Sequence, residues 1–494
     1  MNLTYSETHR ALQAEIRAFA SIHGHLSPGS GGGRRRPDQK ALDWQRLLLE
    51  RGYVARTIPR EYGGYGAEPD VLESAIIADE LSRAGLYPGI MNQGISMLVP
   101  TLLEIGTEEQ RRRWVRSTIR GEAIWCQGYS EPGAGSDLAS VRTRAVVQDG
   151  DFVINGQKIW TSSAHYADMM FLLCRTEPDK PKHHGLSYLL VPMTTPGIEV
   201  RPLTTMTGRA EFNEVFFTDV RVPVDQIVMG RGDGWSVANV TLRHERLMLG
   251  DPNKLMHRVR RIGDLMERTC VDGIRIIDTP EFRDRLLKLQ AEVLASRCHH
   301  LRLLTERARG EQGSVKQMIV KYFGTMLGYR LSSLAVDVLG ASGLVYEPRG
   351  EAVDDDEATM WQIDYMYDLG LMIGGGTSQI QKNIIAERGL GLPREPQVPA
   401  DAAGMSNAVG GSGGGAAPFR PDAAGTSHAV GGLGEERRRS PPVIKWSSAP
   451  ARRSVSSSAS SGTSWAGACR WRRFTVWRGG GPDSTSRSGA GWWS

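Results

Sequence analysis

The sequence predicts an α+β protein with a helical N-terminal domain, a middle β domain, a C-terminal helical bundle and a disordered tail. Three observations support this fold class. Apolar residues recur at helical spacing up to residue 121 and again after residue 235. Short alternating runs rich in Val, Ile, Phe and Thr lie between those segments. Beyond residue 396 the composition is dominated by Gly, Ala, Ser, Pro and Arg. The expected domains are residues 1–122, 123–232, 233–396 and 397–494.

The first segment is expected to be helical throughout. Leu12, Ile16 and Phe19 fall on one face of a helix, and the same spacing recurs further along the segment. Residues 28–37, which contain five Gly or Ser residues in a row followed by three arginines, interrupt the pattern and are expected to form a basic loop.

The middle segment is expected to be a β domain because β-branched and aromatic residues alternate with polar ones over short runs. Turn pairs such as Asp149-Gly150 and Asn155-Gly156 separate these runs. The expected strands are Ala145–Val147, Phe152–Ile154, Met169–Cys174, Ser187–Pro192 and Val215–Phe217.

Helical periodicity returns after Trp235 and predicts three long helices, over residues 253–269, 281–309 and 314–339. Long helices joined by short polar loops are typical of a bundle. Glycine-rich runs at residues 340–343 and 374–376 interrupt the helical pattern.

The tail is expected to be disordered because its composition cannot bury enough apolar surface to offset the entropy of ordering. Residues 401–411 recur with few changes as residues 422–432. Six of the twelve tryptophans lie in the tail without apolar periodicity, which suggests a shifted reading frame or read-through.

From Val398 onward there are 12 Lys and Arg against 5 Asp and Glu, which leaves 48 against 50 before it. A nearly neutral body argues against a nucleic-acid enzyme.

Five scattered cysteines without a Cys-x-x-Cys or Cys/His spacing predict a reducing compartment and no metal site. The N-terminus lacks the apolar stretch of a signal peptide, and no apolar run is long enough to span a membrane. We therefore expect a cytoplasmic protein without a membrane span.

The most informative run is Cys126-Gln-Gly-Tyr-Ser-Glu-Pro-Gly-Ala-Gly-Ser-Asp137, where the helical segment gives way to the β domain. Its glycines allow backbone N–H groups to approach a ligand, and Ser130 and Ser136 add hydroxyls. By composition alone, a ligand-binding loop and an ordinary Gly/Pro turn capped by Ser136 and Asp137 explain the run equally well.

This run resembles the flavin-binding signature of the acyl-CoA dehydrogenase family, apart from Tyr129, which stands at an apolar position of the signature. A second block, Ile154-Asn-Gly-Gln-Lys-Ile-Trp-Thr-Ser162, is similar to another motif of the family. Residues 216–223, 376–381 and 387–394 continue the resemblance. It covers residues 4–395 in the family's order and spacing.

The resemblance implies a middle β-barrel-like domain, a C-terminal four-helix bundle and FAD between them. The implied reaction is α,β-dehydrogenation of an acyl-CoA thioester to the 2-enoyl-CoA, with electrons passed to an electron-transfer flavoprotein. In this reaction a carboxylate removes the α-proton while hydride leaves the β-carbon. The resemblance also implies an oligomer, with copies of itself or with a related subunit.

Carried over residue by residue, the resemblance assigns FAD contacts to two motifs and to one hydroxyl near the end of the domain. The expected cofactor-binding residues are Gln127, Gly128, Tyr129, Ser130, Ser136, Trp160, Thr161, Ser162 and Thr377. The expected substrate-binding residues are Ser136, Arg243 and Arg246.

The catalytic base departs from the commonest pattern of the family. Many members carry a Glu immediately before the late Gly-Thr pair, where this chain has Gly375. In another group the base lies on a bundle helix one residue before an Arg, and Glu245 followed by Arg246 matches that place. We expect Glu245 to be the base. The room that Gly375 leaves is consistent with a bulky, branched or long acyl chain, which Met206, Met248 and Met372 could line.

Two further departures keep alternatives open. A Gln-x-x-Gly-Gly loop of the homotetrameric members is Asp337-Val-Leu-Gly-Ala341 here, and no counterpart of a flavin-binding Arg is evident near residues 280–285. This resembles heteromeric members that act on steroid side chains. The alternatives are a catalytically weak or structural subunit of such a complex, and a related flavin monooxygenase or oxidase.

Overall fold

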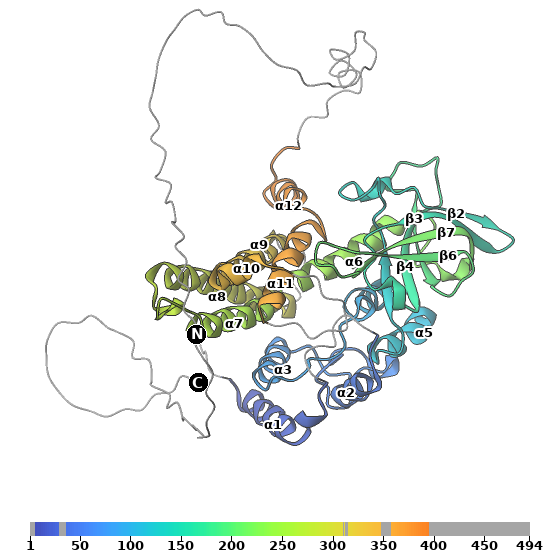
Figure 1. Cartoon of the computed structure of the whole chain (residues 1–494). Coiled ribbons are helices and arrows are strands. Elements are labelled where there is room, and N and C mark those ends of the chain that lie inside the picture. Colours follow the sequence, from blue (N-terminus) through green and yellow to red (C-terminus); the bar gives the residue numbers. More distant parts are fainter. Residues whose placement is uncertain (1–4, 29–35, 310, 312–314, 347–356, 395–494) are drawn as a thin grey trace, which may run out of the picture. The chain divides into compact units, whose positions relative to one another are not determined.

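The computed structural model describes residues 5–28, 36–309, 311, 315–346 and 357–394. They belong to one compact unit, and the predicted disordered tail lies outside them. The chain runs through a helical segment, a β sheet and a second helical segment (Figure 1). The predicted α+β fold class is therefore confirmed.

The described part of the N-terminal segment contains five α-helices, whose first turns are mostly capped by side chains. Ser6, Asp38, Asp70 and Thr107 each accept a hydrogen bond from a backbone N–H of the helix that they begin. The apolar stripe of the first helix is buried, as the periodicity predicts. The helices are α1 (Glu7–His23), α2 (Gln39–Glu50), α3 (Val71–Arg83), α4 (Val99–Ile105) and α5 (Glu108–Ile119).

The middle segment forms one seven-stranded sheet in the order β1-β4-β2-β3-β7-β6, with β5 paired to β4 (Figure 1). β1 runs parallel to β4, whereas β5 runs antiparallel to it. Two of the strands, β1 and β6, were not among those expected from the sequence. The strands are β1 (Trp125–Gly128), β2 (Arg144–Gln148), β3 (Asp151–Lys158), β4 (Met169–Arg175), β5 (Leu186–Pro192), β6 (Ile198–Leu203) and β7 (Phe212–Pro223).

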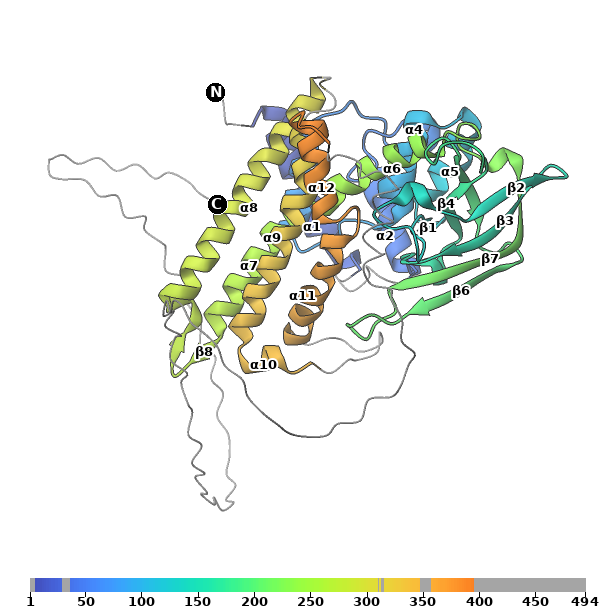
Figure 2. The ribbon, with the colours of Figure 1, turned by 90° about the horizontal axis from the view of Figure 1, so that it is seen from above.

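The C-terminal segment is a bundle in which α9 packs against α7, α8 and α11 (Figure 2). Ile262, Leu331 and Trp361 are fully buried in its core. Among the described residues, no helix is long and apolar enough to cross a membrane. The helices are α6 (Gly234–Leu249), α7 (Pro252–Arg268), α8 (Pro280–Ala308), α9 (Val315–Leu339), α10 (Ala341–Leu344), α11 (Glu357–Ile373) and α12 (Ser378–Ile384).

Candidate active site

The two positions that the sequence offers for the base are neighbours in the structure. Glu245 lies on α6, and Gly375 lies in the turn between α11 and α12. A Cβ built on Gly375 would lie 3.3 Å from Glu245 Oε1 and 2.7 Å from Leu249 Cδ1. Gly375 also has φ +64, a conformation that favours glycine. The Glu245 carboxylate thus occupies the space beside position 375.

Glu245 is in an environment that favours its protonated form. Burial raises the pKa of the Glu245 carboxyl. A hydrogen bond from Gln127 of β1 and the positive charges of Arg246 and Lys321 act in the opposite direction. A carboxylate that is desolvated and yet held by polar partners is the arrangement expected of a general base.

The raised pKa of Glu245 predicts a stability effect that needs no substrate. The unfolded chain titrates this carboxyl near its usual value of about 4.3, so the folded protein is destabilised by its ionisation as pH rises through the higher folded pKa. Glu245→Gln should therefore raise Tm at about pH 8 and raise it less at about pH 5. Thermal unfolding at both pH values checks this. Glu199→Gln is the control, because Arg201 lowers the pKa of Glu199; an equal Tm change for Glu245→Gln at both pH values would contradict the prediction.

The loop after β1 is fixed by a buried ion pair. Lys158 Nζ donates to Glu131 Oε1 at 2.8 Å and to the Tyr129 carbonyl at 2.9 Å. Glu131 also accepts hydrogen bonds from the backbone N–H groups of Arg142 and Thr143 at 2.6 and 2.8 Å. Burial raises the pKa of Glu131, but Lys158 and these hydrogen bonds outweigh burial and lower it. The pair holds the loop in one conformation. Lys158 belongs to the second motif but was not among the expected site residues.

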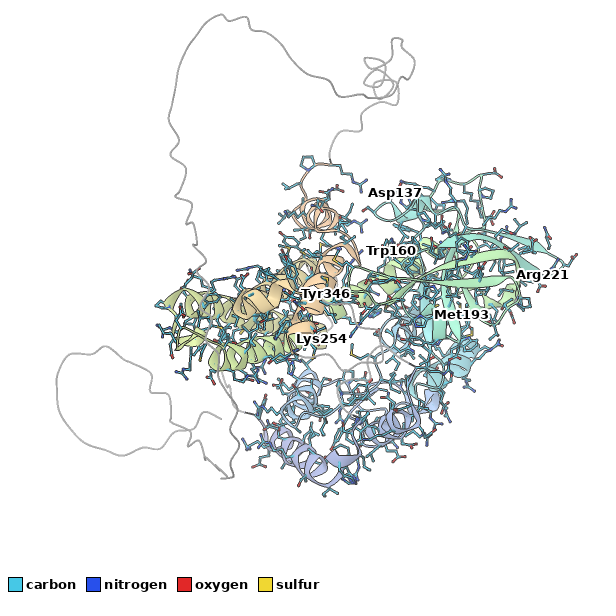
Figure 3. All side chains as sticks on the ribbon, viewed as in Figure 1. Asp137, Trp160, Met193, Arg221, Lys254 and Tyr346 are labelled. Carbon is cyan, nitrogen blue, oxygen red and sulfur yellow. The ribbon has the colours of Figure 1, made fainter. Side chains whose placement is uncertain are left out.

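Trp160 presents an exposed aromatic surface at the end of β3. Its side chain is 59% exposed and its φ is +60, which is unusual for a residue with a side chain. Its ring packs edge-on against Phe212 at 5.9 Å, and Phe212 stacks on Tyr367 of α11 at 6.5 Å. Trp160 therefore lies on the side of the sheet that is next to the bundle (Figure 3).

The residues after Trp160 combine a fixed backbone with an unused hydroxyl. The Thr161 N–H donates to the Asn213 carbonyl, and Asn213 Nδ2 donates to the Thr161 carbonyl. Thr161 is fully buried, and its hydroxyl has no hydrogen-bond partner within the described part of the chain. Ser162 follows and is half-buried. An exposed ring and an unpaired hydroxyl at one turn are consistent with a site for a polar aromatic cofactor.

The other expected cofactor residues have varied surroundings. Ser130 accepts a hydrogen bond from Ile159 N–H through its carbonyl, and Ser136 is exposed. A Cβ on Gly128 would lie 2.3 Å from Met170 Sδ, so packing inside the sheet requires this glycine. Tyr129 is buried in the core below the loop. Thr377 caps α12 by accepting a hydrogen bond from Ile380 N–H.

The two expected substrate-binding arginines point to different places. Arg243 Nη2 lies 2.6 Å from both carboxylate oxygens of Glu104 on α4, so it is held in an ion pair outside the Glu245 site. Arg246 lies beside Glu245, and burial lowers its pKa. Its Nε is buried and has no hydrogen-bond partner among the described residues. Arg246 therefore has a donor available for a ligand, whereas Arg243 is already paired.

The fold and the site define a flavin-linked class of enzyme, and family models match along the chain. The models for the N-terminal, middle and C-terminal domains of acyl-CoA dehydrogenase match residues 6–122, 126–220 and 232–390. The chain belongs to the acyl-CoA dehydrogenase family of flavin oxidoreductases, as the motifs predict.

Individual relatives cover most of the chain. Acyl-CoA dehydrogenase IpdE1 of Mycobacterium tuberculosis is 38% identical over 379 residues, which are 76% of this chain and 94% of the relative. The solved Tcur3481-Tcur3483 steroid ACAD is 29% identical with a TM-score of 0.66, over 80% of this chain and 100% of that one. The ChsE4-ChsE5 complex from Mycobacterium tuberculosis is 30% identical with a TM-score of 0.65, also over 80% and 100%.

Proposed function

We propose that this chain catalyses FAD-dependent α,β-dehydrogenation of an acyl-CoA thioester and passes the electrons to an electron-transfer flavoprotein. The observation that carries the proposal is the Glu245 carboxylate beside position 375. Both positions that family members use for the base lead to this one place, so the loss of a Glu at position 375 does not remove the base.

The residues of this chain fit a bound FAD, the removal of the α-proton and the binding of the substrate. Gln127–Ser130, Ser136, Trp160–Ser162 and Thr377 would hold the cofactor, with the exposed Trp160 ring and the unused Thr161 hydroxyl as the strongest indications. When bound, FAD supplies the acceptor for the hydride that leaves the β-carbon. Glu245 takes the α-proton at a carboxylate oxygen, and burial makes it a stronger base than an exposed Glu. The free Nε of Arg246 can bind a polar group of the substrate.

The acyl group is proposed to occupy a cavity of about 670 Å³. His244, which precedes Glu245 on α6, lines this cavity together with side chains of α3 and α4. Most of the lining is apolar, as in Ile77, Val99 and Leu103. A space of this size fits a bulky acyl group, and the relative described as a steroid ACAD supports that choice.

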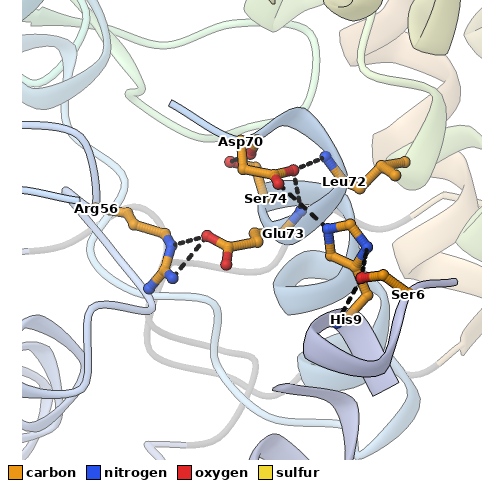
Figure 4. Close-up of polar contacts among 7 residues, drawn as sticks. All are labelled: Ser6, His9, Arg56, Asp70, Leu72, Glu73 and Ser74. Atoms are coloured by element: carbon orange, nitrogen blue, oxygen red, sulfur yellow. Dashed lines mark hydrogen bonds and ion pairs between the residues drawn. The ribbon is translucent and has the colours of Figure 1, made fainter. Parts of the chain in front are cut away.

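The wall of the cavity is fixed by polar contacts at the start of α3 (Figure 4). Asp70 accepts hydrogen bonds from Leu72 N–H at 2.7 Å and Glu73 N–H at 3.1 Å, and its other oxygen lies 3.2 Å from His9 Nε2 of α1. Arg56, which lines the cavity, pairs with Glu73 at 2.6 Å. Arg56 is therefore already paired, and so is Glu104 of the lining, which pairs with Arg243, so the cavity selects chiefly by shape and apolar contact.

Filling the cavity should change substrate preference. Leu103→Trp is expected to lower kcat/KM for a ring-bearing acyl-CoA about 10- to 100-fold, while a short straight-chain acyl-CoA loses little. Steady-state kinetics with both substrates measure the ratio. Leu72→Trp is the matched control, because Leu72 is 41% exposed and lies outside the cavity lining. A proportional loss for both substrates would place the acyl group elsewhere.

We also propose that the working enzyme is an oligomer, with a related subunit as the favoured partner. Asp337, which belongs to the altered motif and lies in the last turn of α9, forms an ion pair with Arg285 of the same chain. That pairing engages one of the two arginines within residues 280–285, where a flavin-binding Arg was sought. Leu344, Val345 and Ile373 are 84%, 69% and 65% exposed, which favours a covering subunit. The solved ChsE4-ChsE5 complex supports a heteromer.

One alternative is a structural subunit that completes a partner's site, and the altered loop at residues 337–341 favours it. The products distinguish the two proposals. The chain, alone and co-expressed with a related subunit, is incubated with acyl-CoAs and an electron-transfer flavoprotein, and the products are weighed by mass spectrometry. A product lighter by two hydrogens that disappears with Glu245→Gln supports dehydrogenation by this chain. A product that survives the substitution in the complex assigns the chemistry to the partner.

A further inference from the structure

A buried lysine of the bundle interacts electrostatically with the proposed base. Lys321 is on α9 and is only 1% exposed. Its Nζ donates to the carbonyl of Gly376 at 2.7 Å and to the carbonyl of Met372 at 3.2 Å. Met372 is in the last turn of α11, where free carbonyls carry the negative end of the helix dipole. The ammonium thus joins the end of α11 to the turn that precedes α12.

The turn that Lys321 holds, residues 374–376, lies beside the Glu245 carboxylate. Gly375 and Gly376 have φ of +64 and +98, which glycine adopts readily. Gln381 Nε2 donates to the Gly375 carbonyl at 2.9 Å, so each of these two glycines has its carbonyl held by a side chain. Because a Cβ on Gly375 would be 3.3 Å from Glu245 Oε1, a shift of this turn would change the space around the carboxylate.

Close helix packing fixes Lys321 relative to Glu245. A Cβ built on Gly250, just after α6, would lie 2.4 Å from Val320 Cγ1, and a Cβ on Gly324 would lie 2.6 Å from Gly250 Cα. The two glycines therefore let the end of α6 approach α9 closely. Lys321 lies between Val320 and Gly324 on α9, within electrostatic reach of Glu245.

We propose that Lys321 is a positioning residue for the base, which holds the Gly374–Gly376 turn against Glu245 and supplies a positive charge that favours the ionised carboxylate. The inference rests on the proposed function for its role in catalysis. Its physical core, the hydrogen bonds from the ammonium to the turn and the charge that acts on the carboxyl, stands without that function.

The other groups that act on the Glu245 carboxyl do not duplicate the role of Lys321. Arg246 is the second cation that acts on the carboxyl, and it is itself opposed by the charge of Arg388. From β1 and the following loop come the amide of Gln127 and the phenol of Tyr129. The turn contributes only glycines. Burial lowers the pKa of Lys321 to about 8, so its charge is present near neutral pH and disappears as pH rises through that value.

The first test is the pH profile of flavin bleaching by acyl-CoA in the FAD-loaded protein. Lys321→Met removes the charge and the two hydrogen bonds, and we expect the acid limb of the profile to move up by about one pH unit. Lys321→Arg keeps the charge and should return the limb toward that of the wild type. The difference between wild type and Lys321→Met should shrink above about pH 8, where Lys321 itself is neutral.

Lys288→Met on α8 is the control, because Lys288 is exposed and pairs with Asp284. An unchanged acid limb in Lys321→Met would overturn the proposal.

The second test needs neither flavin nor substrate. Thermal unfolding at about pH 7 is measured for wild type, Glu245→Gln, Lys321→Met and the double variant. Without the lysine, the buried carboxylate has lost a partner, so Glu245→Gln should raise Tm more in the Lys321→Met protein than in the wild type. Equal Tm changes in both backgrounds would overturn the proposal.

The two tests separate this inference from the proposed function. If Lys321→Met alone does not fold, the double variant should be recovered in better yield, and failure of both variants to fold counts against the proposal. If Glu245→Gln bleaches at the wild-type rate, the proposed base is wrong, while the unfolding measurements still decide whether Lys321 acts on the carboxylate. If Glu245→Gln is inactive and Lys321→Met behaves as the wild type in both tests, the function stands and the role of Lys321 falls.

Discussion

Replacing Glu245 with Gln is expected to lower the rate of acyl-CoA dehydrogenation by about 10²- to 10⁴-fold, the range that a positioned general base contributes. Gln has nearly the same shape and can still pack beside the turn at Gly375, but it cannot accept the α-proton. The expected loss is in kcat, with a small change in KM, because the side chain acts on the reacting proton rather than on substrate binding.

The comparison needs variants that separate chemistry from folding. Glu199→Gln makes the same chemical change at an exposed residue of β6 that pairs with Arg201, and it should keep the wild-type rate. Flavin content and Tm are measured for each variant, and Glu245→Gln should retain its flavin and unfold at no lower Tm than the wild type. If Glu245→Gln loses flavin together with activity, the loss reflects assembly of the site, and the assignment of Glu245 as the base is not supported.

Breaking the buried Lys158–Glu131 pair is expected to give the largest loss of stability. Lys158 is fully buried and Glu131 nearly so. Lys158→Met leaves the Glu131 carboxylate without its counter-charge, and removing one partner of a buried ion pair costs about 3–5 kcal/mol of the free energy of unfolding. The loop after β1 should loosen, and the purified protein should contain less flavin. Chemical denaturation and the ratio of flavin to protein measure both effects.

Two further variants test the reason for that loss. Lys182→Met removes an exposed ion pair with Asp137 in the same domain, and it should cost only about 0–1 kcal/mol. The double variant Glu131→Gln with Lys158→Met removes both charges, so it should be less destabilised than the sum of the single changes. If Lys158→Met and Lys182→Met cost the same, the buried pair does not fix the loop.

The long helices of the bundle could be predicted closely because apolar residues recur at helical spacing over many turns. The expected helix over residues 281–309 is observed as Pro280–Ala308, and the one over 314–339 as Val315–Leu339. The strands β1 and β6 were missed for opposite reasons. β1 has only four residues and is buried nearly throughout, so no alternation is visible, whereas β6 is partly exposed and lies on the edge of the sheet.

The site could be predicted only as far as local motifs extend. The motifs selected Trp160 and Glu245, but they offered two separate positions for the base, and only the fold shows that those positions are neighbours. Arg243 was expected at the substrate, and that assignment stays a prediction; its ion pair with Glu104, 139 residues away in sequence, is a contact that no local pattern reveals. Lys321 was missed for the same reason. A lysine between Val320 and Tyr322 is a visible departure from an apolar stripe, but its carbonyl partners lie in a different helix and turn.

The most direct test of the central claim is the visible spectrum of the purified protein, alone and with a related subunit, when acyl-CoAs are added without oxygen. We expect a yellow protein whose flavin absorption bleaches with at least one bulky acyl-CoA, and a Glu245→Gln protein that stays yellow with the same substrate. A wild-type protein that carries flavin and remains yellow with every acyl-CoA, or a Glu245→Gln protein that bleaches at the wild-type rate, would contradict the claim.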